Sequence, residues 1–144
     1  MPQIHWSTRW QPGPAAVAVE PGAEVVVGVT EFVTHRPWST FSVGAEGMRL
    51  RRTWPATPGA VGMWLWVELG PRMNRSGSIT VWTAHEHLMD FVARPDHRRI
   101  VRAHHDRGAL RSATWTAPFS GRSAVYDSAW RLVSGAAPWP VGTP

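Results

Sequence analysis

The order of hydrophobic periods along the chain constrains its fold more than any other feature of the sequence. Alternating apolar and polar residues rich in β-branched side chains predict strands, and apolar residues three or four positions apart predict helices. Strands are predicted over residues 24–35, 60–69, 76–83 and 109–117, and helices over residues 37–54, 84–94 and 96–107. This β-α-β-β-α-β order, in which Pro95 divides the second helical segment, predicts an α+β, ferredoxin-like domain with a four-stranded antiparallel sheet.

The remaining residues form the two ends of the chain. Residues 1–22 contain four Pro and two Gly without a sustained period, so we expect an irregular N-terminal arm, which Trp6 and Trp10 could still order. A helix is predicted over residues 123–133, which makes residues 23–134 a single domain followed by a Gly- and Pro-rich tail over residues 135–144. Residues 1–13 lack the layout of a secretory signal, and no apolar run approaches the roughly 18 residues of a membrane span. We therefore expect a cytoplasmic protein.

The composition narrows the chemistry available to the chain. Its 144 residues include no Cys, which excludes disulfides, thiolate metal sites and a Cys nucleophile. The formal charge of +5 comes from 15 basic residues, all of them Arg, against 10 acidic ones. The absence of Lys is typical of GC-rich coding, and no nucleic-acid-binding motif accompanies the Arg clusters. We therefore expect no nucleic-acid partner.

The 10 Trp residues are a more informative excess, because indoles suit either a dense core or a pocket for flat apolar ligands. Trp64, Trp66 and Trp82 fall on the hairpin predicted from residues 60–69 and 76–83, and they occupy both faces of the sheet. In a ferredoxin-like domain the helices cover one sheet face and leave the other to a partner subunit or a ligand. We therefore expect a homodimer that binds a hydrophobic small molecule.

Three stretches carry a resemblance to a known family. TPGAVGMWLWVELG has a Pro-Gly turn leading into a strand, and LRSATWTAP has a closing Arg-Ser-x-x-Trp strand. Between them, SGSITVWTAHEHLMDFVARPDHRRIVRAH has a strand ending in Val-Trp and a helix reaching Phe-Val-x-x-Pro-x-His. Over about residues 25–117 the chain resembles the dimeric α+β barrel family of antibiotic-biosynthesis monooxygenases and its spheroidene-monooxygenase-like relatives. The resemblance implies a dimeric α+β barrel. The family includes cofactor-free oxygenases of polycyclic aromatic polyketides, haem-dependent oxygenases, haem-degrading enzymes and non-catalytic members.

The resemblance to haem-degrading members implies that haem is a candidate cofactor, with His104 as the ligand of its iron. Their axial His lies late in the second helix, in an Ala-His step that Ala103-His104 matches here, and Phe91 stands where those relatives have Trp. A haem site needs a neutral imidazole facing an apolar pocket and basic groups for the propionates, for which Arg98 and Arg102 are candidates. The alternative for His104 is an ordinary surface or hydrogen-bonded His.

A cofactor-free oxygenase instead needs a base and a stabiliser of the substrate anion in an apolar cavity. His35 is a candidate base at the end of the first strand, where Arg36 could bind the anion, and His97 and His104 are further candidates. The candidate substrate-binding residues are aromatic: Trp38, Trp64, Trp66, Trp82 and Phe91. The plainer interpretation keeps each Trp in the core and makes His97 a packing residue between the two helical pieces.

A metal site built from side chains alone is a weaker hypothesis. His97 pairs with His104 at a spacing of seven and His104 pairs with Asp106, but no His-Glu-x-x-His pattern is present. Nucleotide-binding and hydrolase functions have no phosphate loop or nucleophile elbow to support them.

The sequence therefore predicts a small-molecule tailoring enzyme, a monooxygenase-like oxidase of a bulky aromatic or polyene biosynthetic intermediate. The enzyme is either cofactor-free or haem-dependent. Because a fold does not determine a reaction, two alternatives stay open. One is a non-catalytic protein that binds a hydrophobic ligand or acts as an accessory factor, and the other is a non-redox cyclase.

Overall fold

The computed structural model describes residues 4–71 and 73–139, and its centre is an antiparallel sheet. Four long strands form most of the sheet, in the order β4-β5-β3-β6, with β6 at one edge. Their bounds are β3 (Glu24–Thr34), β4 (Ala60–Leu69), β5 (Asn74–Trp82) and β6 (Ala109–Pro118). The two strands that follow helices, β4 and β6, lie at the outside of this set, as the ferredoxin-like order requires. The predicted four-stranded core is confirmed.

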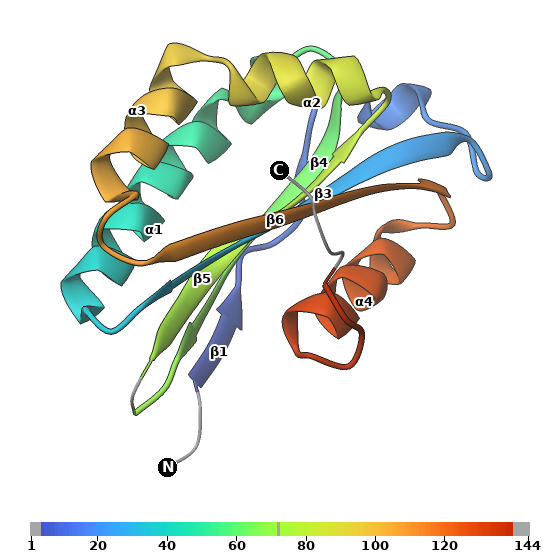
Figure 1. The fold of residues 1–144 in the computed structure, drawn as a ribbon. Helices are drawn as coiled ribbons and strands as arrows, with labels where there is room; N and C mark the ends of the chain where they lie inside the picture. Colours follow the sequence, from blue (N-terminus) through green and yellow to red (C-terminus); the bar gives the residue numbers. More distant parts are fainter. Residues whose placement is uncertain (1–3, 72, 140–144) are drawn as a thin grey trace.

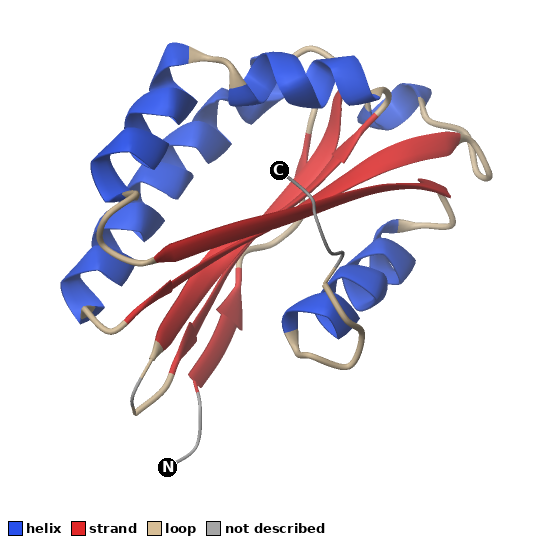
Figure 2. Ribbon diagram, in the orientation of Figure 1, coloured by secondary structure: helices blue, strands red, loops and turns tan. Residues whose placement is uncertain are grey.

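The helices lie on both faces of the sheet (Figures 1 and 2). Helix α1 (Pro37–Thr53) follows β3, and α2 (His85–Val92) and α3 (Pro95–His104) follow β5; these three cover one face. Helix α4 (Arg122–Val133) covers the opposite face. Arg94 has extended backbone angles because it precedes Pro95, and this confirms the predicted division of the second helical segment. Within the described part of the chain, no helix has both the length and the apolar character needed to cross a membrane.

The N-terminal segment is more regular than its sequence predicts. Strands β1 (Ile4–Ser7) and β2 (Gln11–Pro12) pair antiparallel with the outer edge of β4, and a short 3-10 helix, η1 (Ala16–Ala18), follows. The sheet therefore has six strands rather than four. The ring of Trp10 packs against Trp64 with centroids 4.6 Å apart, and it occupies the space that a Cβ on Gly62 would fill. The expectation of an irregular arm was wrong because edge pairing and this contact, rather than a local period, order the segment.

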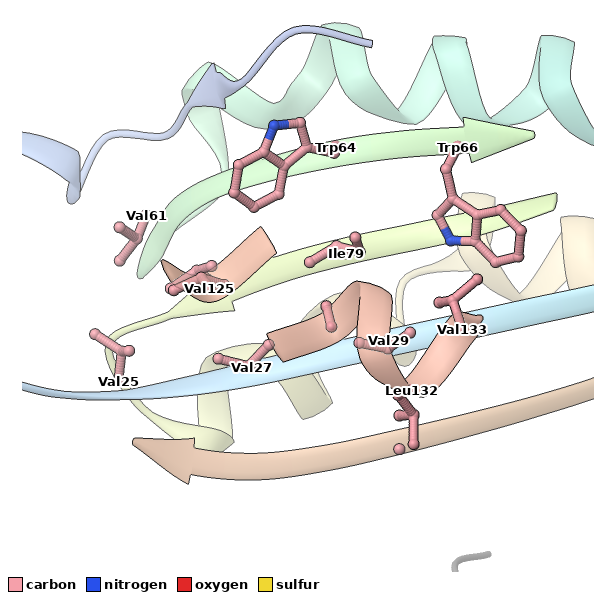
Figure 3. Close-up of a cluster of buried hydrophobic side chains, with 13 residues drawn as sticks. Val25, Val27, Val29, Val61, Trp64, Trp66, Ile79, Val125, Leu132 and Val133 are labelled. Carbon is pink, nitrogen blue, oxygen red and sulfur yellow. The ribbon is translucent and has the colours of Figure 1, made fainter. Parts of the chain in front are cut away.

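Two separate hydrophobic clusters follow from the alternation of side chains along the strands. Val25, Val27 and Val29 of β3 point toward α4 and form the larger cluster with Trp64 and Trp66 (Figure 3). The smaller cluster lies toward α1 and α2, where 3-10 helix η2 (Trp54–Ala56) brings Trp54 against two other buried rings. The centroid of Trp54 is 4.8 Å from that of Trp82 and 5.7 Å from that of Phe91.

The sheet face that we expected a partner subunit or ligand to cover is covered from within the chain. Helix α4 buries Val125, Ala129, Leu132 and Val133 against it. The terminal helix itself is confirmed, but the sequence does not indicate which face it covers. The homodimer stays a prediction, and it requires a surface other than the sheet face beneath α4.

Two Gly→Ala substitutions test the packing of the sheet. A Cβ on Gly77 of β5 would overlap the carbonyl oxygen of Thr30 on β3, whereas a Cβ on Gly44 of α1 would meet no atom within 4 Å. We expect Gly77→Ala to lower the free energy of unfolding by about 1–3 kcal/mol. Gly44→Ala should raise it by about 1 kcal/mol, since Ala is the better helix former. Urea unfolding of both variants measures this, and equal effects would contradict the strand register.

Candidate functional site

A cavity of about 540 Å³ lies between the sheet and helices α1 and α3. Its walls are mainly apolar side chains of β4, α1 and α3, and its volume lies within the range of small-molecule sites. Among the described residues that line it, none is Asp, Glu or Arg, and the titratable ones are all His. Hydroxyl side chains on β3 and β5 form a polar strip on the sheet side of the cavity: Thr30, Ser76, Ser78 and Thr80. Such a cavity suits an uncharged, largely apolar ligand with a few polar groups.

His104, in the last turn of α3, is buried and hydrogen-bonded at both ring nitrogens. Its Nδ1 lies 3.0 Å from the carbonyl oxygen of Ile100, which can only accept, so Nδ1 carries the proton. Its Nε2 lies 3.0 Å from Oγ of Ser42 on α1, and the two groups share a hydrogen bond. The arrangement fixes the orientation of the imidazole and joins α3 to α1 beside the cavity.

His97, in the first turn of α3, also lines the cavity but has a different environment. Burial lowers the pKa of His97 below its ordinary value, and the charge of Arg94 acts in the same direction. The Asp96 carboxylate and the backbone of Val92 oppose the shift. Nδ1 of His97 is buried without a hydrogen-bond partner in the described part of the protein, and the ring meets Phe91 edge-on with centroids 5.3 Å apart. His97 is therefore a neutral imidazole near pH 7.

An ion pair before α3 sets the charge beside His97. Arg94 Nη2 lies 2.5 Å from Oδ2 of Asp96, and Arg94 also donates to the hydroxyls of Thr53 and Thr57. Burial by itself would raise the pKa of Asp96, but the hydrogen bond and charge of Arg94, together with the backbone N–H of His97 at 2.8 Å, lower it below its ordinary value. Asp96 is thus an anion whose charge can stabilise a protonated His97.

Two buried hydroxyls at the cavity lack partners. Oγ1 of Thr40 on α1 and Oγ of Ser76 on β5 make no hydrogen bond to the described protein atoms. Most buried polar atoms in folded proteins are paired, so each exception requires an explanation. Because a hydroxyl reorients easily, these two groups are candidates for hydrogen bonds to a bound ligand.

The predicted site residues separate into three groups. His97, His104 and Phe91 line the cavity; Trp66 borders it as well, although its ring packs against Trp130 in the cluster beneath α4. Trp64 and Trp82 are buried elsewhere: Trp64 packs beneath α4, and Trp82 packs against Trp54, with its Nε1 donating to Thr80 at 2.9 Å. The remaining five are exposed and lie outside the lining of the cavity: His35, Arg36, Trp38, Arg98 and Arg102.

The residues around His104 do not fit a haem in this arrangement. An axial ligand needs a ring nitrogen free to bind iron, but Nε2 of His104 is occupied by Ser42 and Nδ1 by Ile100. The expected propionate partners, Arg98 and Arg102, are exposed and do not line the cavity. Nor do three or more His, Cys, Asp or Glu side chains gather as a metal site anywhere in the described residues.

Sequence reasoning missed the polar residues that complete the site. Ser42 and Thr40 belong to α1, and Thr30, Ser78 and Thr80 belong to strands whose polar positions read as a solvent-facing side. The sequence shows polar and apolar residues alternating along β5, but only the structure shows that the polar side faces the cavity rather than water. The hydrogen bond between His104 and the carbonyl oxygen of Ile100 could have been suggested by spacing, because residues four positions apart lie close together in a helix.

The pH dependence of stability tests the environment of His97. Because its pKa is lower in the folded protein than the 6.5 of the free side chain, the unfolded chain binds a proton first as the pH falls. Stability contributed by neutral His97 is therefore fully present above pH 6.5 and is lost as the pH falls toward the folded-state pKa. We expect His97→Gln to flatten this decline in thermal unfolding measured between neutral and mildly acidic pH. His85→Gln, at an exposed site on α2, is the control and should leave the decline unchanged.

Comparisons with known proteins support the fold. The sequence matches no protein-family model and no curated protein. A variant of SnoaB, a cofactor-independent oxygenase from Streptomyces nogalater, superposes with a TM-score of 0.51 at 23% identity, over 65% of this chain and 92% of that chain. A Bacteroides thetaiotaomicron protein suggested to be an oxidoreductase superposes with a TM-score of 0.52 at 12% identity, over 68% and 99% of the two chains. The family resemblance is thus confirmed at the level of the ferredoxin-like fold.

Proposed function

We propose that the protein is a monooxygenase-like tailoring enzyme that oxidises a bulky aromatic or polyene biosynthetic intermediate without a cofactor. The observation that carries this proposal is the apolar cavity of about 540 Å³ that holds His97 as a neutral imidazole. A base that is neutral at pH 7 inside an apolar site is one of the protein groups that such a reaction requires. The oxygenase named among the structures of similar fold supports the reaction class.

The chemistry begins with proton removal from an acidic C–H or O–H of the substrate. Since Nδ1 of His97 is buried, Nε2 is the ring nitrogen that we assign as the proton acceptor. The resulting carbanion or phenolate donates electrons to dioxygen. When a methylene group is oxidised to a carbonyl, one oxygen atom enters the product and the other leaves as water, so no external reductant is needed. Protonated His97 is stabilised by the carboxylate of Asp96 next to it.

The polar strip and the unpaired hydroxyls orient the substrate. Ser76 and Thr40 lie on opposite sides of the cavity, one on the sheet and one on α1, so they can bond polar groups at two edges of a flat molecule. The rings of Phe32 and Phe91 also line the cavity and provide apolar contact surface. The hydroxyls also stabilise the substrate anion, a role that no charged side chain among the described lining residues can take.

The test uses the purified protein and a polycyclic hydroquinone or related phenolic probe under ¹⁸O₂. Dioxygen uptake with ¹⁸O in the product, in a protein without visible absorption, supports the proposal. Quinone formation with release of hydrogen peroxide and no ¹⁸O would show an oxidase instead. A Soret band that disappears in His104→Ala would assign haem and overturn the cofactor-free reaction.

Binding without turnover is the second candidate function, and one observation favours it. The imidazole of His104 is committed to Ser42 and Ile100, and His105 is exposed, so His97 is the one candidate base in the interior of the cavity. The described lining also has no charged stabiliser of an anion. A carrier for a hydrophobic metabolite needs neither. Quenching of Trp fluorescence by the probe with no product under dioxygen would support this function. Product formation at the same rate without dioxygen would instead support the non-redox cyclase.

A further inference from the structure

Exposed apolar side chains gather at one end of the molecule, beside the cavity. This end is formed by the start of α1, the end of α3 and the start of β6 (Figure 1). Four apolar side chains lie there with large exposed fractions: Trp38 at 82%, Phe41 at 60%, Leu110 at 53% and Val101 at 37%. Phe41, Val101 and Leu110 also line the cavity. These four residues and the arginines next to them, Arg36 and Arg107, are called the rim below.

Direct contacts hold the parts of the rim together. The rings of Trp38 and Phe41 lie 6.2 Å apart on α1. Thr34, at the end of β3, accepts a hydrogen bond from the backbone N–H of Arg36 at 3.1 Å and donates one to the carbonyl of Arg107 at 2.8 Å. The start of α1 is thereby tied to the loop that leads from α3 into β6. The rim is therefore one connected surface and not a set of scattered side chains.

The rim is also positively charged. Residues 34–42 contain no acidic residue, and residues 101–111 contain only Asp106. The same two segments contain Arg36, Arg102 and Arg107, and these three form no ion pair in the described part of the chain. The segments also contain His35 and His105. Arg111 is already paired with Glu31 at 2.7 Å. The surface beside the cavity thus combines exposed aromatic rings with guanidinium groups available to anions.

We propose that the rim docks on an anionic lipid surface, so that an apolar ligand passes from the bilayer into the cavity. Trp beside Arg is the combination that favours the membrane interface, where rings enter the acyl boundary and guanidinium groups meet lipid phosphates. The cavity behind the rim has no charged residue among its described lining, so it accepts molecules that partition into lipid. The ligand identity rests on the proposed function, but the docking does not.

A second copy of the chain fits the rim less well. A two-fold contact through this surface would place Arg36 and Arg107 against the same residues of the partner, with Asp106 as the single acid to offset them. An acidic protein or a nucleic acid would satisfy the arginines, but it would leave Trp38 and Phe41 without an apolar environment. A bilayer with anionic head groups satisfies both.

The proposal is tested by sedimentation of the intact protein with lipid vesicles. We expect binding to vesicles of phosphatidylcholine mixed with phosphatidylglycerol, little binding to phosphatidylcholine alone, and weakening at high salt. Trp38→Ser with Phe41→Ser should abolish binding, and each of Arg36→Gln and Arg107→Gln should weaken it about five-fold. Val17→Ser, at an apolar side chain 97% exposed on η1, and Arg122→Gln on α4 are the matched controls. Circular dichroism confirms that the variants fold.

Each other outcome overturns the proposal. No sedimentation with anionic vesicles, or sedimentation that the rim variants leave unchanged, would show that the rim does not bind lipid. Binding to an acidic protein or to single-stranded nucleic acid at the same salt, without vesicle binding, would assign the rim to a macromolecular partner. Because no arm of this experiment measures turnover, absence of activity on the phenolic probe leaves its result unaffected.

Discussion

Replacing His97 with Gln is expected to lower kcat by about 10²- to 10⁴-fold, the range usually contributed by general-base catalysis. Gln keeps a polar side chain of similar length at the start of α3 but cannot accept a proton at neutral pH. His104 cannot replace it, since both nitrogens of His104 are already hydrogen-bonded, and His105, the remaining His of the described lining, is exposed to water. Steady-state dioxygen uptake with the phenolic probe measures the effect. His85→Gln, on the exposed surface of α2, should retain full activity.

The pH profile separates a catalytic His97 from a structural one. The base must be neutral, so the rate should rise with pH along a single limb and then level off. Burial and Arg94 lower the pKa of His97, so the midpoint of this limb should lie below 6.5 and the rate should be flat through neutral pH. Loss of the limb in His97→Gln, with residual rate independent of pH, is the expected signature. A variant with reduced rate but an unchanged limb would show that His97 only supports the cavity wall.

The sequence predicted the fold well because its strongest signals are local. Alternation of β-branched residues identified β3, and Pro95 marked the break between α2 and α3, since a residue before Pro disfavours helical angles. Strands β1 and β2 carry no comparable signal: β2 has only two residues and ends at Pro12. Their order depends on pairing with β4 and on the packing of Trp10, which are contacts between distant segments.

The candidate site could be predicted only in part, because it depends on which face each residue occupies. Trp64 and Trp66 alternate onto the face covered by α4, whereas Trp82 lies on the face of α1, so three Trp of one hairpin do not share a pocket. His97 was among the predicted residues, but its selection over His35 rests on burial. The bond from Ser42 to His104 joins residues 62 positions apart, and no pattern in the sequence indicates it.

The second large effect is expected where charged residues are buried beneath α4. Glu31 of β3 is 2% exposed and forms ion pairs with two arginines, Arg75 at 2.8 Å and Arg111 at 2.7 Å. Arg75 also contacts Glu68 at 3.1 Å and donates to the carbonyl of Val133 at the end of α4. One guanidinium therefore links two strands of the sheet to the helix that covers them.

We expect Glu31→Ala to lower the free energy of unfolding by about 3–5 kcal/mol, because Arg75 and Arg111 lose their shared partner while Arg75 stays largely buried. Urea unfolding measures the loss. Glu46→Ala removes an acid of α1 whose two partners, Arg49 and Arg99, are exposed, and it should cost less than about 1 kcal/mol.

The geometry of Arg75 also determines which part of the protein should lose local stability in Glu31→Ala. Without Glu31 to orient its guanidinium, the bond to Val133 weakens, so amide exchange in α4 should accelerate more than exchange in α1 on the opposite face. Replacing Glu31, Glu68 and Arg75 together with Leu removes the three buried charges and should restore part of the global stability, but not the bond to Val133. Uniform acceleration across both faces in Glu31→Ala would show that the charged group stabilises the sheet alone and does not hold α4 against it.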